Sequence, residues 1–209
     1  TQNATIVISE PAALLASVSS STPVLCNGDS TGSAIAGASG GTLPYTYLWT
    51  GSGSTSSSSG NLPSGVYSVL VTDARGCTST SPALISEPPL LSTTILSPVN
   101  VNCSGGNNGM ATVLASGGTS PYAYSWSPGG GIAPIASGLV ANTYTVTVTD
   151  GNSCSQQAIV SINEPTPLAM SVLSTVMNSC FGNMAGSIEV EATGGSSPYS
   201  YQWSPTGGN

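Results

Sequence analysis

The five cysteines are the residues of this 209-residue chain with the plainest chemistry. Cys26, Cys103 and Cys180 recur at one constant interval, and the same interval separates Cys77 from Cys154. Equal spacing predicts that each position has one role, repeated along the chain. Thiols in a turn-rich chain with only 4% charged residues favour an oxidising compartment, where disulfides persist. The cysteines are therefore read as a disulfide framework.

A serine nucleophile is the next chemistry that the sequence suggests. The stretch GDSTG, residues 28–32, fits the nucleophile-elbow pattern around Ser30. A serine of this kind needs a neighbouring base, and the chain contains no histidine and no lysine. The equivalent residues of the next copy read GGNNG, so the serine is not repeated. Ser30 is interpreted as part of a polar turn, and neither a catalytic residue nor an enzyme is expected.

Acidic residues recur at two positions and raise the question of calcium. Asp73 and Asp150 share one position, and Glu10, Glu87 and Glu164 share the other, each before a proline. Calcium needs several oxygen ligands in one cluster, and a single Glu at each junction is too few. The Asp is expected to cap a turn and the Glu-Pro pair to end a strand. No metal and no cofactor are expected.

An aromatic phrase occurs three times, as GGTLPYTYLW, GGTSPYAYSW and GGSSPYSYQW. Aromatic side chains at positions i, i+2 and i+4 share one face of a strand. That face is either an exposed platform for sugar rings or part of a core. The core is favoured, because so short a copy has few other large side chains to bury. A further Tyr starts a later strand and resembles a tyrosine corner. The expected core aromatics are Tyr45, Tyr47, Trp49, Tyr67, Tyr122, Tyr124, Trp126, Tyr144, Tyr199, Tyr201 and Trp203.

These residues belong to an internal repeat whose period is the interval between the like cysteines. Residues 12–88 and 89–165 align without a gap and share 27 identities, which is far above chance. Both are expected to be complete copies. Residues 1–11 match the last strand of a preceding copy, and residues 166–209 match the first part of a further one. The chain is thus expected to be a window onto a longer array.

Each copy shows the alternation of β-strands and none of the periodicity of helices. Turn signals separate about seven short strands per copy. The expected fold is all-β, with tandem immunoglobulin-like antiparallel β-sandwiches arranged end to end. Prolines at each junction restrict the backbone, which predicts a stiff rod. Arg75 is the only basic residue, so nucleic acid is not an expected partner. No apolar run approaches the roughly 18 residues that a spanning helix needs, so no membrane span is expected in this segment.

The fold suggests a pairing for the cysteines. Cys77 opens the last strand of one copy and Cys103 follows the first strand of the next, so collinear strands would hold these two thiols far apart. First and last strands of a sandwich are often neighbours. Cys26–Cys77 and Cys103–Cys154 are therefore the expected disulfides, each within one copy. Cys180 would find its partner near position 231, beyond this chain.

The whole chain resembles the SprB repeat, a family named for a large gliding-motility adhesin of Bacteroidota. The shared pattern is C-x-G-x(3)-G, then GG-x(2)-PY-x-Y-x-W, then Y-x-V-x-V-x-D-x(3)-C and EP. In the first copy it runs from Cys26 to Pro88, and in the second from Cys103 to Pro165. One departure is Ser153, which stands where the first copy has Gly76.

The resemblance implies a very long surface protein, exported by the type IX secretion system, whose repeats form a filament for adhesion and gliding. Its partners would be further copies in the same chain and neighbouring filament chains, with surface polysaccharide bound elsewhere in the full protein. In that phylum the Asp29-Ser30-Thr31 pattern is typical of O-glycosylation, which makes Ser30 a candidate site. The alternative function is a tandem carbohydrate-binding module that uses the Tyr and Trp side chains as platforms.

Overall fold

The fold is described from a computed structural model, which covers residues 2, 6, 9–182 and 185–204. Every regular element within these residues is a β-strand, and the described part holds no helix long and apolar enough to cross a membrane. The chain divides into two compact units. The first unit contains Thr1–Ser92, Ser116–Pro121 and Asp150–Cys154, and the second contains Thr93–Ala115, Tyr122–Thr149 and Ser155–Asn209.

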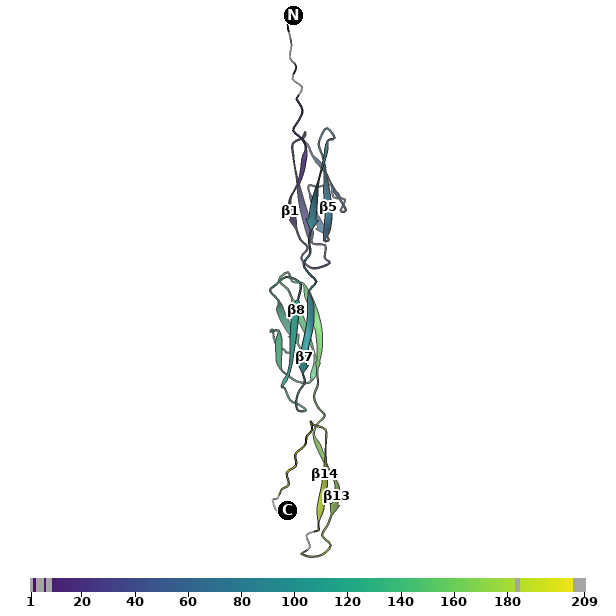
Figure 1. The fold of residues 1–209 in the computed structure, drawn as a ribbon, viewed down its shortest axis with the longest axis vertical. Coiled ribbons are helices and arrows are strands. Elements are labelled where there is room, and N and C mark those ends of the chain that lie inside the picture. The colour runs from purple at the N-terminus through teal and green to yellow at the C-terminus, as the bar shows by residue number, and fades with distance from the viewer. Residues whose placement is uncertain (1, 3–5, 7–8, 183–184, 205–209) are drawn as a thin grey trace. The chain divides into compact units, whose positions relative to one another are not determined.

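The first unit contains one β-sandwich, built by the copy at 12–88 from two three-stranded antiparallel sheets (Figure 1). One sheet has the order β1-β2-β4 and the other has the order β3-β5-β6. Lettered along the chain, these are strands A-B-E and C-F-G of the immunoglobulin topology, without strand D. The strands are β1 Leu15–Thr22, β2 Gly32–Ser39, β3 Thr46–Thr50, β4 Ser58–Leu62, β5 Gly65–Thr72 and β6 Thr78–Ile85.

Alternating side chains explain how each strand contributes to the core. In β5, Val69 and Val71 are fully buried between the sheets, and Trp49 of β3 lies opposite Val69 in the sheet register. Val24, Leu62 and Ile85 close the same core. The side chains that alternate with them face outward, as the period of two requires, and they include apolar ones such as Leu48 and Leu84. The predicted all-β, sandwich-type fold is confirmed.

The second unit contains most of a second sandwich, which the copy at 89–165 forms in the same way. Its sheets have the orders β7-β8-β10 and β9-β11-β12. The strands are β7 Ser92–Val99, β8 Gly109–Ser116, β9 Ala123–Ser127, β10 Ile135–Leu139, β11 Asn142–Thr149 and β12 Ser155–Ile162. Each complete copy, fully described, thus has six strands instead of about seven. The region between the third and fifth strands forms one short strand, and the rest of it is a loop.

The remaining parts of the two units are smaller. The strands β13 Ala169–Val176 and β14 Ser187–Thr193 pair as an antiparallel hairpin, and a third copy of the aromatic phrase follows them. Most of the segment 1–11 lies outside the described residues, so its assignment as the last strand of a preceding copy stays a prediction.

The paired glycines before each aromatic phrase have a steric reason. Gly40 has φ +73°, and a Cβ at this position would lie 2.0 Å from the carbonyl oxygen of Ala13. The next amide, Gly41 N–H, donates to Ala12 O at 2.7 Å. Only glycine permits this backbone conformation and so close an approach. The glycines therefore connect the segment before β1 to the turn that leads into β3.

Candidate functional site

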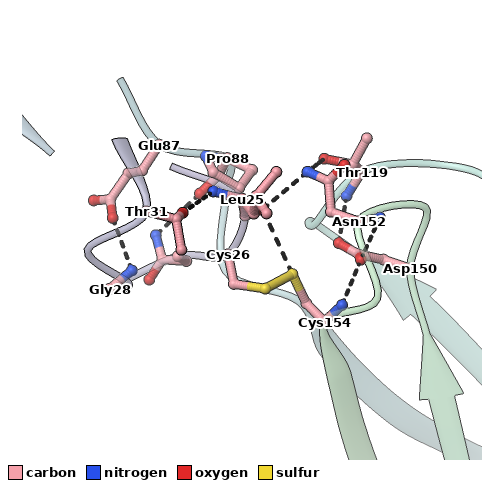
Figure 2. Close-up of a disulfide and its surroundings, with 11 residues drawn as sticks. Leu25, Cys26, Gly28, Thr31, Glu87, Pro88, Thr119, Asp150, Asn152 and Cys154 are labelled. Carbon is pink, nitrogen blue, oxygen red and sulfur yellow. Dashed lines mark hydrogen bonds between the residues drawn. A yellow bond between two sulfur atoms is a disulfide. The ribbon is translucent and has the colours of Figure 1, made fainter. Parts of the chain in front are cut away.

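The chemistry-bearing residues that the structure brings together are Cys26 and Cys154. They form a disulfide with a Cα–Cα distance of 5.7 Å across a sequence separation of 128 residues (Figure 2). This junction disulfide joins a loop of the first copy to a turn of the second, and both segments belong to the first unit. The expected Cys26–Cys77 and Cys103–Cys154 pairs are wrong: Cys77 and Cys103 are unpaired and exposed, as is Cys180.

Strand direction explains the error. β1 and β6 are neighbours, as the sequence suggested, but they run in the same direction. Near their starts Ala16 N donates to Ser79 Oγ at 3.1 Å, and beyond their ends Val24 N donates to Ser86 O at 3.0 Å. Cys26 follows the end of β1 and Cys77 precedes the start of β6. An eight-residue strand, about 26 Å long at ~3.3 Å per residue, therefore separates the two thiols.

Three hydrogen bonds that involve side chains shape the loop that carries Cys26. Leu25 N donates to Thr31 Oγ1 at 2.8 Å, and Gly28 N donates to the Glu87 carboxylate at 2.9 Å. Asn27 Nδ2 donates to Pro88 O at 3.0 Å. The Glu-Pro pair thus holds the cysteine loop beside the segment that leaves β6. From the sequence, this Glu-Pro pair was expected only to end a strand.

Asp150 organises the turn that carries Cys154. Its carboxylate is buried and accepts from the backbone N–H groups of Thr119, Asn152 and Cys154, each at 2.9 Å. Burial alone would raise the pKa of this carboxyl, but the three donors outweigh it and hold the pKa below its ordinary value of 3.8. The expectation that this Asp caps a turn is confirmed.

The junction disulfide has a polar contact beside it. Asn152 Nδ2 donates to Leu25 O at 2.9 Å and to Thr119 Oγ1 at 3.1 Å (Figure 2). The Sγ atom of Cys154 lies 3.5 Å from the same Leu25 oxygen. The side chain of Asn152 therefore bridges the loop of the first copy and two turns of the second. Nothing in the spacing of the repeat marked this residue, because the equivalent position in the first copy is Arg75.

The loop that carries Cys26 and the turn that carries Cys154 each have a counterpart in the other copy, where the cysteine is unpaired. Asp73 accepts from Thr42 N, Arg75 N and Cys77 N at 2.8–2.9 Å, as Asp150 does around Cys154. Burial raises the pKa of Asp73, and these donors lower it to a net value below 3.8. Around Cys103, Gly105 N donates to the Glu164 carboxylate at 2.6 Å, as Gly28 does to Glu87. The turn around Cys77 and the loop around Cys103 are thus built like those that are joined.

The aromatic phrase lies inside the two complete sandwiches. Trp49 and Trp126 are 1% and 4% exposed, and their indole Nε1 atoms donate to Ser56 O and Ala133 O. The tyrosines of the phrase are half-buried and pack against the same cores. In the third copy Trp203 is 53% exposed, because the described residues of this copy form only the strands β13 and β14, without a second sheet to cover the ring. The expected core role therefore does not hold for Tyr199, Tyr201 and Trp203 in this structure.

The later tyrosines form the tyrosine corner that the sequence suggested. Tyr67 Oη donates to Pro63 O at 3.0 Å, and Tyr144 Oη donates to Val140 O at 3.2 Å. Each bond links a residue near the start of a strand to the backbone four residues upstream. The corner fixes where β5 and β11 begin in the two sandwiches.

The remaining candidates from the sequence are the glycosylation site at Ser30 and a metal site. Ser30 is exposed in the cysteine loop, and its O-glycosylation stays a prediction. No cluster of three or more potential metal ligands occurs among the described residues.

Comparisons with known proteins bear on family and on fold. A family model described as the SprB repeat matches residues 18–54, 95–131 and 173–208, together just over half of the chain. None of the curated proteins matched.

Several solved structures are similar at low identity. Three N-terminal domains of the Highly Immunogenic Outer Capsid protein (Hoc) of bacteriophage RB49 are 18% identical, over 88% of this chain and 71% of that one, with a TM-score of 0.48. Domains 1–6 of the surface layer protein SbsC are 16% identical, over 78% of this chain and 29% of that one, with a TM-score of 0.32. Dpr2 Ig1-Ig2, in complex with DIP-Theta Ig1-Ig3, is 11% identical, over 76% of this chain and 70% of that one, with a TM-score of 0.29. At such scores these likenesses carry no argument about function.

Proposed function

The chain belongs to the SprB repeat family, and from that premise we propose that it is a structural stalk segment of a long adhesin filament on the bacterial surface. The family and the disulfide support a repeat protein located outside the cell. Adhesion to surfaces and gliding motility are the activities that we propose for the whole filament. Within it, this segment is proposed to have no catalytic role and to space the adhesive parts from the cell.

The observation that carries the proposal is the placement of the aromatic phrase. In both complete copies its Trp is buried in the core and donates from Nε1 to the carbonyl of a loop residue. A carbohydrate-binding module would need those rings exposed in a groove. The exposed Trp203 does not favour that alternative, because the side chain is covered at the equivalent position of each complete sandwich.

Labelling of intact cells tests the proposal. Antibodies against residues 12–165 should label unpermeabilised cells of the source bacterium. Deletion of the gene should abolish attachment to glass and gliding, and a gene with fewer repeats should restore both. Labelling only after permeabilisation would contradict the surface location. Loss of attachment after replacement of this segment by an equal length of unrelated β-sandwich repeats would contradict a purely structural role.

A further inference from the structure

The junction disulfide closes a covalent loop that contains most of the two copies. Residues 27–153 lie between Cys26 and Cys154, and they include β2 to β6 and β7 to β11. Only β1 and β12 of the two sandwiches lie outside the loop. A force applied to the two ends of the chain reaches Cys26 from one side and Cys154 from the other. It then has a covalent path that avoids the enclosed residues.

We propose that the junction disulfide is a tension bypass, which carries a pulling force from one copy to the next and shields the strands of the enclosed loop from it. This mechanical function goes beyond the role of a stalk and holds whether or not the filament mediates adhesion. It requires only the connectivity between Cys26 and Cys154. Hydrogen bonds of a sheet yield under force, whereas the covalent path does not lengthen by unfolding.

The structure specifies which strands the bypass leaves exposed to force. β1 precedes Cys26 and pairs with β2, so tension at the N-terminal side can strip it from that sheet. β12 follows Cys154 and pairs with β11, so it is the strand at risk on the other side. Once these two edge strands and the hairpin β13–β14 are extended, further pulling acts on the disulfide. Ten of the twelve strands of the two sandwiches lie within the loop and are shielded from the force.

Extension of single molecules measures the bypass directly. The complete chain is held by peptide tags at its two ends, so that no cysteine is used for attachment. At ~3.6 Å per residue, the oxidised chain should reach a contour length of about 300 Å, because only residues 1–26 and 154–209 can extend. Reduction with a phosphine should raise the limit to about 750 Å, a gain of about 450 Å.

Serine variants assign the gain to one pair of cysteines. The double variant Cys26→Ser/Cys154→Ser should reach the long contour without reductant. Cys180→Ser, which removes an exposed unpaired thiol, should keep the short contour. Contour length counts residues, so the result does not depend on whether the double variant folds.

Two results would overturn the proposal. One is an oxidised natural chain that extends as far as the double serine variant. The other is a short contour that is lost in Cys77→Ser/Cys103→Ser and kept in Cys26→Ser/Cys154→Ser. Neither result would contradict the proposed surface location, because antibody labelling of cells tests that location separately. A cytoplasmic location found by labelling would likewise leave the measured contour length unchanged.

Discussion

Replacement of Trp49 by alanine should severely destabilise the first sandwich. Trp49 is 1% exposed, donates from Nε1 to Ser56 O and lies opposite Val69 in the sheet. Complete burial of a Trp removes ~150–250 Å² from water, and truncation of such a side chain costs about 3–5 kcal/mol. A domain of this size is stable by roughly 0.05–0.15 kcal/mol per residue, or about 4–12 kcal/mol. Trp49→Ala should therefore remove a large fraction of that stability.

Hydrogen exchange followed by peptide mass spectrometry is the suitable assay, because it reports each copy separately. In Trp49→Ala, peptides of β5 should exchange at rates raised by roughly two to three and a half orders of magnitude, since about 1.4 kcal/mol corresponds to a factor of ten. Peptides of β11 in the second copy should change little. The matched control is Trp203→Ala, which alters the same phrase where its Trp is 53% exposed and should leave both cores unaffected.

The refuting result is equally specific. If Trp49→Ala left exchange in β5 unchanged and instead abolished binding to a polysaccharide, the Trp would be a binding platform. The core assignment and the stalk proposal would then both fail. Iodide quenching gives a second check, since Trp49 and Trp126 should be protected and Trp203 should be accessible.

The hydrogen bonds and the cysteines give three further predictions. Tyr67→Phe removes the bond to Pro63 O and should lower the unfolding free energy of the first copy by about 1 kcal/mol, measured by urea titration. The pKa of Asp73 and of Asp150 is lowered by folding, so their contribution to stability should be complete above pH 3.8 and disappear as the pH falls through the lower folded value. The melting-temperature deficit of Asp150→Asn should accordingly shrink in acid, and a constant deficit would argue against the charge as the cause. In a recombinant chain of four copies, oxidised glutathione, which takes up the two electrons and two protons, should link cysteines at the sequence separation of 128 that joins Cys26 to Cys154. Links within single copies, found by mass spectrometry of non-reduced peptides, would contradict the observed pairing.

Much of the fold could be predicted from the residues themselves. Alternation in segments such as TYTVTVTD identifies strands, and the constant interval between like residues identifies the copies. The burial of Trp49 and Trp126 followed from how few large side chains each copy has. The Asp turns and the tyrosine corners were also predicted, because each depends on short-range spacing that the sequence displays directly.

The cysteine pairing could not be predicted in the same way. It depends on whether the first and last strands of a sandwich run in the same direction, and composition and spacing are identical in both cases. The interval from Cys26 to Cys77 equals that from Cys103 to Cys154, which made the local pair attractive. The role of Glu87 was missed for a related reason, since its partner Gly28 is distant in the sequence. Contacts between copies, such as Asn152 with Leu25, leave no periodic signal, because they involve different positions of the repeat.

The long sequence separation of the disulfide has a consequence for a chain that continues this pattern with further copies. The separation exceeds the length of one copy, so successive junction disulfides would enclose overlapping loops. β12 lies outside the loop that Cys26 closes, but it would lie inside the loop that starts at Cys103. The shortest covalent path would run from each disulfide to the next through segments such as 154–180, one for every two copies. At ~3.6 Å per residue, such segments limit the extension to about 47 Å per copy, against about 280 Å without the disulfides. The disulfides, which strand direction places between copies, would thus limit how far a chain of sandwiches lengthens under tension, even though each sandwich can unfold.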